Sequence, residues 1–167
     1  MYDTVTRTPL DQSLVAKLSW TRQHILAAIE GLDEDVLRRS YVPSGWTPLS
    51  MVRHLTLDVE RIWFRGAVAG DPQVPEAIRR GVSGFHDRES LSAVEIIAGY
   101  RAECERSDKI IAGLPAETPT RWKPYPDAPT DLAGVVLHVV VETACHAGHL
   151  DIVRENLDAR QFLVVDG

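Results

Sequence analysis

Four residues in the last third of the chain have the types and spacing that bind metal ions: His138, Glu142, His146 and His149. In an α-helix each residue advances by about 100°, so these four side chains fall within an arc of about 80°. Imidazole and carboxylate groups are ligands for zinc and for other divalent transition metals. The spacing therefore predicts a metal-ligating stripe on one face of a helix.

The residues around this stripe are apolar on nearly every side, which is typical of a helix buried inside a bundle. They are Val135, Val136, Leu137, Val139, Val140, Val141, Ala144 and Ala147. A buried carboxylate costs several kcal/mol unless it is paired, protonated or bound to a cation. We therefore expect Glu142 to be buried and to share a metal ion with the histidines beside it. A buried polar cluster without metal is the alternative.

A second helix carries His54 and Asp58, which lie about one turn apart. This helix is predicted to begin with Thr47 as its N-cap and Pro48 as its first residue, the positions that these residue types favour. A single histidine in an amphipathic helix is more often structural than a ligand. The carboxylate and imidazoles of the last helix change that balance, because a metal site in a bundle is built from facing helices.

The remaining periodicity predicts helices over residues 11–31 and 90–113, a short turn over 33–39 and a loop over 70–88 with a turn near 76–80. Ser90 is the expected N-cap of the 90–113 helix, and Glu103 is expected on its solvent face. Residues 114–130 hold five prolines and cannot be helix interior, so they form a crossover to Thr130, the expected N-cap of the last helix at 131–158. The expected fold is an all-α four-helix bundle with long crossover loops, forming one domain over residues 1–167.

Composition narrows the class of protein. The chain has 167 residues and a net charge of −6, with acidic and basic residues interleaved, so no basic stripe indicates nucleic acid. We find neither an apolar run long enough for a bilayer nor a signal sequence in the first ten residues, and expect a cytoplasmic protein that does not bind membranes. Cys104 and Cys145 have no metal or redox spacing and are expected to be buried.

Two segments together resemble the DinB-like superfamily of metal-binding four-helix bundles: SGWTPLSMVRHLTLDVERIWFRG from Ser44, and LHVVVETACHAGHLDIVRE from Leu137. The resemblance runs from the first helix to Asp158, and within the superfamily the sequence is most similar to a branch related to mycothiol-dependent maleylpyruvate isomerase. Many members carry one histidine on the second helix and a His-x-x-x-His pair on the last. The matching positions are His54, Glu142 and His146, so a glutamate replaces the first histidine of the pair, as in the isomerase.

The resemblance implies a metal-dependent enzyme that uses a low-molecular-weight thiol, mycothiol or a similar one, as an S-transferase or isomerase acting on a small electrophile. Zinc is the favoured ion, with nickel, iron and manganese as alternatives. Three protein ligands leave coordination positions open, which is the pattern of a catalytic site.

Other assignments stay open. His149 stands where many relatives have glutamine. It is, with Asp58, a candidate catalytic residue, as general base in a metal-dependent hydrolase, and Asp58 and His138 are also candidates for orienting the ligating imidazoles. A non-catalytic metal-binding or ligand-binding stress-response bundle is the alternative from another class. A homodimer is a further expectation.

Overall fold

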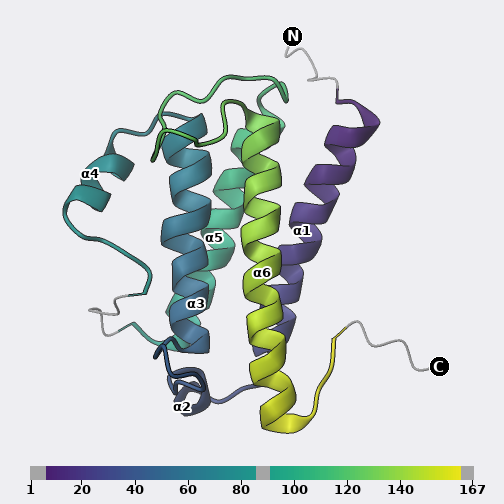
Figure 1. Cartoon of the computed structure of the whole chain (residues 1–167), viewed down its shortest axis with the longest axis vertical. Coiled ribbons are helices and arrows are strands. Elements are labelled where there is room, and N and C mark those ends of the chain that lie inside the picture. The colour runs from purple at the N-terminus through teal and green to yellow at the C-terminus, as the bar shows by residue number, and fades with distance from the viewer. Residues whose placement is uncertain (1–6, 86–90, 163–167) are drawn as a thin grey trace.

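The computed structural model describes residues 7–85 and 91–162, and the described chain is a bundle of helices (Figure 1). The elements in chain order are α1 (Pro9–Ile29), α2 (Glu34–Leu37), α3 (Pro48–His54), η1 (Leu55–Val68), α4 (Gln73–Arg79), α5 (Ala93–Ala112) and α6 (Leu132–Asp158). The bundle consists of α1, α5, α6 and the continuous column of α3 and η1. The predicted all-α bundle is therefore confirmed.

The helical column of α3 and η1 changes its hydrogen-bond pattern directly after His54. Thr47 caps α3 by accepting a hydrogen bond from the Ser50 N–H, and Pro48 is its first residue, as predicted. From Leu55 onward the helix is a π-helix, in which hydrogen bonds span five residues. Such turns are rare and often lie at functional sites, and this one begins directly after His54.

Two predicted N-caps, Ser90 and Thr130, are not the N-caps of the helices that follow them. The N-cap of α5 is Ser92, because Glu95 three residues later completes a reciprocal capping box with it; Ser90 lies outside the described residues. The N-cap of α6 is Asp131, whose carboxylate accepts a hydrogen bond from the Gly134 N–H at 2.8 Å. Thr130 instead uses its carbonyl oxygen to accept a hydrogen bond from Thr120.

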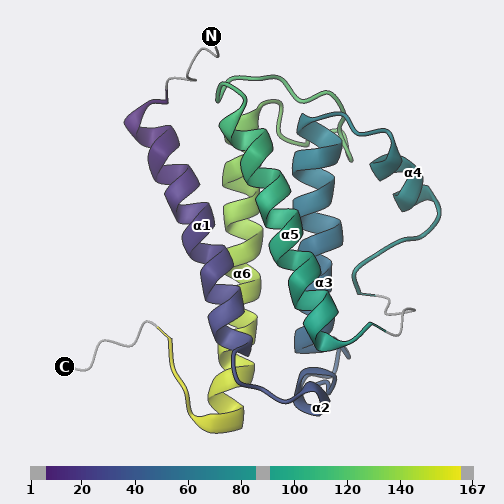
Figure 2. The ribbon, with the colours of Figure 1, turned by 180° about the vertical axis from the view of Figure 1, so that it is seen from behind.

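The core lies between two packed pairs, α1 with α6 and α5 with η1. From behind, α5 is seen between α1 and α3 (Figure 2). Fully buried side chains from these helices include Leu18, Ile25, Leu55, Phe64, Tyr100, Val139 and Leu150. Among the described helices, α6 alone is long and apolar enough to meet the length and composition of a membrane span. In the described bundle, α6 packs along α1.

The burial expected for Glu103, for α6 and for Cys145 is wrong. Glu103 is only 4% exposed, because its carboxylate turns inward to Arg65 and Arg106. The helix α6 is not buried all round, since Leu137 and Val141 are about half exposed. Cys145 is also exposed, whereas Cys104 is partly buried.

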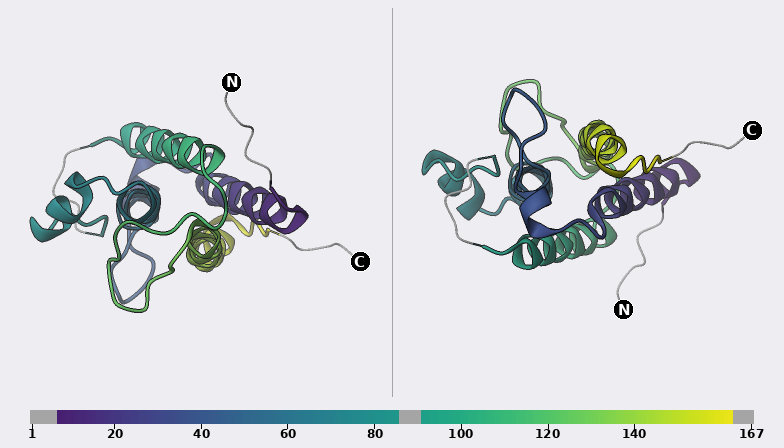
Figure 3. Two further views of the ribbon diagram at one scale, coloured as in Figure 1. Left: turned by 90° about the horizontal axis from the view of Figure 1, so that it is seen from above. Right: turned by 90° about the horizontal axis from the view of Figure 1, so that it is seen from below.

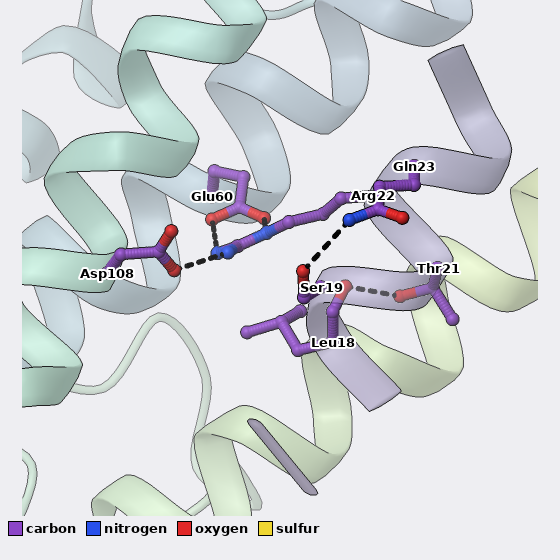
Figure 4. A network of polar contacts seen from close by, with 7 residues as sticks. All are labelled: Leu18, Ser19, Thr21, Arg22, Gln23, Glu60 and Asp108. Atoms are coloured by element: carbon purple, nitrogen blue, oxygen red, sulfur yellow. Dashed lines mark hydrogen bonds and ion pairs between the residues drawn. The ribbon is translucent and has the colours of Figure 1, made fainter. Parts of the chain in front are cut away.

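A buried arginine ties three helices together (Figure 4). Arg22 of α1 donates two hydrogen bonds of 2.7 Å to the carboxylate of Glu60 in η1, and a third of 2.6 Å to Asp108 in α5. Arg22 and Glu60 are both buried. This paired, charge-assisted geometry fixes the position of η1 relative to α1 and α5.

The proline-rich crossover before α6 runs over one end of the bundle (Figure 3). The N–H groups of Arg121 and Trp122 both donate to the carbonyl oxygen of Ala67 at the end of η1, at 2.7 and 3.2 Å. The crossover is thereby held against η1 at the point where it leads into Pro124 and Tyr125.

Candidate metal centre and adjoining pocket

Three side chains from two helices converge: His54 at the end of α3, and Glu142 and His146 one turn apart on α6. One ligand atom from each lies within 4.8 Å of the others. The Nε2 atom of His146 is 3.4 Å from Oε2 of Glu142, and the His54 and His146 rings meet edge-on with centroids 4.9 Å apart. Two imidazoles and a carboxylate at this separation fit zinc and related divalent ions.

Glu142 does not have the environment expected from the sequence. Its side chain is 40% exposed, because the outer face of α6 is open to solvent. The cost of burying a carboxylate is therefore not what points to a metal here. The convergence of Glu142 with two imidazoles carries that argument instead.

His54 is held by a carboxylate on its own helical column. Its Nδ1 atom is 3.0 Å from Oδ2 of Asp58, and the same oxygen accepts hydrogen bonds from the Gly84 N–H at 2.8 Å and the Ser83 hydroxyl at 3.3 Å. A carboxylate in this position favours the tautomer that carries the proton on Nδ1. That tautomer leaves the Nε2 lone pair available to a metal ion.

The other two histidines of the α6 stripe have different surroundings. His149 is exposed, and its Nδ1 atom is 3.4 Å from Nδ1 of His146. His138 packs against Trp63, with ring centroids 4.3 Å apart. Burial lowers the pKa of His146, and the nearby His54 lowers it further. Burial likewise lowers the pKa of His138, which favours its neutral form.

A pocket of about 280 Å³ adjoins the three converging side chains. It is lined by His54, Asp58, Val59, Ile62, Trp63, Pro124, Tyr125, His138 and Glu142. Burial raises the pKa of Tyr125, and the negative charges of Glu142 and Asp127 raise it further, so its hydroxyl stays protonated. None of the described lining residues is a lysine or an arginine.

Sequence reasoning missed Tyr125 and the segment Ser83–Gly84–Phe85. Both lie in irregular chain without a recognisable motif, and only the fold brings them to His54 and Glu142. Neither segment is at a fixed sequence spacing from the ligands, so the helical periodicity that revealed the stripe carried no signal for them.

A larger pocket, of about 570 Å³, lies elsewhere, between α1, α2 and α5, and contains none of the three converging side chains. Its lining is mainly aliphatic, with acidic residues at the loop after α1. Volume alone would therefore point away from the residues that can do chemistry.

Comparison with known families identifies a family for most of the chain. A family model described as mycothiol S-transferase matches residues 13–159, which includes His54, Glu142 and His146. The resemblance predicted from the two sequence segments is thereby confirmed at the level of the family. No curated protein matches the chain.

Proposed function

Because the chain belongs to the mycothiol S-transferase family, we propose that it joins a low-molecular-weight thiol to a small electrophile at a divalent metal site formed by His54, Glu142 and His146. The observation that carries this proposal is the convergence of three ligand atoms from two helices within 4.8 Å, directly beside an open pocket. Mycothiol is the thiol that the family supports, and zinc is the ion that the donor set favours. We further propose that the chain acts as one domain.

The proposed division of labour follows from the contacts of each residue. His54, Glu142 and His146 would hold the ion and leave coordination positions open. The chemistry that a divalent ion would supply there is a lowered pKa for a nearby thiol. Asp58 is engaged by three donors, which supports a role in positioning His54 over one in proton transfer. His149, exposed beside His146, is the proposed group that exchanges a proton with bound substrate.

The pocket supports an enzyme over a sealed structural metal site. It borders His54 and Glu142, and Glu142 is itself accessible to solvent. A substrate can therefore reach the open side of the proposed ion. This access favours catalysis over a non-catalytic stress-response bundle.

The lining also limits the electrophile. A pocket of about 280 Å³ holds a small molecule. Apart from the proposed ion, which Glu142 would ligate, its described walls offer no lysine or arginine to pair with an anion. We infer that the part of the electrophile that lies in the pocket away from the ion carries no carboxylate.

The metal site is tested by elemental analysis of purified His54→Ala, His146→Ala and His149→Ala variants after equilibration with Zn²⁺. We expect stoichiometric zinc in the wild-type protein and in His149→Ala, and nearly complete loss in the two ligand variants. Full occupancy in both His54→Ala and His146→Ala would contradict the site.

The electrophile is tested with benzalacetone and its para-carboxylate, two enones that differ in charge, each with mycothiol. We expect a larger rate enhancement over the uncatalysed reaction for the uncharged enone. Ile62→Arg, which adds a cation to the pocket wall, should narrow the difference. Equal enhancement of both enones by the wild-type protein would contradict the inferred preference.

A further inference from the structure

The segment Ser83–Gly84–Phe85, which follows α4, lies directly on the backbone of His54. The Gly84 N–H donates to Oδ2 of Asp58 at 2.8 Å, and the Ser83 hydroxyl donates to the same oxygen at 3.3 Å. This oxygen also faces Nδ1 of His54. One carboxylate oxygen thus joins the loop to the imidazole.

The approach of Gly84 to the helix leaves no space for any side chain. A Cβ atom built on Gly84 would lie 2.2 Å from the Cα atom of His54 and 2.6 Å from the carbonyl carbon of Arg53. Both are backbone atoms, so no rotamer change could relieve the clash. A side chain at position 84 would have to move either the loop or the end of α3.

Phe85 completes the contact from the side. Its ring stacks on the His54 imidazole, with centroids 4.1 Å apart and planes inclined by 22°. The His146 ring meets His54 edge-on. Phe85 therefore covers one face of the His54 ring, and the Asp58 carboxylate contacts its Nδ1 atom. Gly84 packs on the backbone of the same residue.

We propose that Ser83, Gly84 and Phe85 are positioning residues of the metal site, which set the ring orientation and the Nδ1-protonated tautomer of His54. The expected consequence, tighter metal binding, rests on the proposed function. The contacts that orient His54 do not depend on it. The loop after α4 is then part of the site, although it supplies no ligand. Partners of this kind, which orient a ligating histidine, typically change metal affinity by 10–100-fold when lost.

The proposal is tested by Zn²⁺ affinity, measured by competition with a chromophoric chelator, in Gly84→Ala and Phe85→Leu. We expect a loss of about 10–100-fold for Gly84→Ala and a smaller loss for Phe85→Leu. Two matched controls should bind as the wild-type protein does. Gly99→Ala alters a helical glycine with open space around it, and Phe162→Leu removes another phenylalanine that stacks on a histidine, His24.

A second measurement, on metal-free protein, separates this proposal from the proposed function. The ring ¹⁵N and ¹H signals of His54 should report a protonated Nδ1 in the wild-type protein and a mixture of tautomers in Gly84→Ala. Wild-type protein that binds no Zn²⁺ but shows this tautomer shift would overturn the proposed function and support the positioning role. Unchanged tautomer and unchanged Zn²⁺ affinity in both loop variants would overturn the positioning role, and Phe85→Leu provides this answer even if Gly84→Ala does not fold.

Discussion

At the scale of single residues, the site depends on how Asp58 shares one oxygen. That oxygen meets an imidazole from four residues earlier and two donors from a loop 25 and 26 residues later. A charged acceptor makes stronger hydrogen bonds than a neutral one. The carboxylate is therefore better suited than an amide to hold His54 and the loop together.

Asp58→Asn tests this difference with almost no change in shape. We expect Zn²⁺ affinity to fall by about 10–100-fold, because the amide accepts more weakly and can present its N–H₂ group to the imidazole. Asp71→Asn is the control, since Asp71 pairs with Arg65 away from the site, at 2.7 Å. Chelator competition with both variants measures the effect, and equal affinities would argue against a role for the Asp58 charge.

His138 gives a prediction about pH. Burial lowers its pKa below the ordinary value of 6.5, so below about pH 6.5 the unfolded chain binds a proton that the folded protein resists. Stability is therefore lost as the pH falls from about 6.5 through the pKa of the folded state, and above that range His138 has no such effect. In metal-free protein, His138→Gln should show a smaller drop in Tm between pH 7.5 and pH 5.5 than the wild type. The same drop in both proteins would contradict this origin.

At the scale of elements, η1 owes its position to a close approach at Gly66. A Cβ atom there would lie 2.8 Å from Cγ1 of Val74 in α4 and 3.2 Å from the Trp122 ring of the crossover. The glycine lets both segments pack against η1. The crossover in turn brings Tyr125 to the pocket.

Two glycine-to-alanine substitutions in helical segments test this packing, one at the close contact and one in open space. Gly66→Ala should destabilise the protein by about 1–3 kcal/mol, because it overfills a packed contact. Gly99→Ala, with no neighbouring atom within 4 Å, should stabilise it by about 0.5–1 kcal/mol, because alanine favours a helix interior. Denaturant unfolding measures both, and a stable Gly66→Ala would mean that α4 and Trp122 shift without cost.

Helical periodicity explains which parts of this molecule could be predicted from the sequence. Spacing along α6 brought Glu142 and His146 to one face, and the Thr47 and Pro48 pair marked the start of α3. Periodicity alone could not show how many sides of α6 are covered, because valine is also tolerated on an exposed face. The burial expected for Glu142 was wrong for this reason.

The contacts that hold the site in place are non-local, which is why the sequence did not reveal them. Glu103 was expected in solvent because it stands among charged residues on α5, yet η1 supplies a partly buried partner for it, Arg65. The loop residue Gly84 contacts His54 only because the chain folds back toward α3 after α4. Helix caps depend mainly on residues close in sequence. At the start of α5, the reciprocal capping box of Ser92 with Glu95 is a stronger signal than an isolated serine.

At the scale of the whole molecule, the ion pair of Arg22 and Glu60 connects α1 to the helical column that carries His54. Removing one partner leaves the other charge buried, so we expect Arg22→Met to cost about 3–5 kcal/mol. The double variant Arg22→Met with Glu60→Leu should recover much of this loss, because a buried pair can be replaced by apolar side chains of similar size. Denaturant unfolding of the single and double variants measures the recovery, and a double variant less stable than Arg22→Met would contradict it.

The outer face of α6 leaves an apolar stripe in solvent. It consists of Leu137, Val141, Ala144, Cys145, Gly148 and Ile152, which are all exposed and recur at the spacing of one helix face. The expected homodimer stays a prediction. This stripe is the surface on which we expect it to form, because association would cover apolar side chains that the bundle leaves in water.

Two valine substitutions test the dimer with matched chemistry. Val141→Lys places a charge in the stripe, where Val141 is 53% exposed, and Val94→Lys places one on α5, where Val94 is 76% exposed. If the stripe is the interface of a C2 dimer, each substitution in it is present twice and like charges meet across the axis. We expect sedimentation to give a dimer for the wild type and Val94→Lys and a monomer for Val141→Lys. A wild-type monomer, or a dimer that survives Val141→Lys, would rule out this face as the interface.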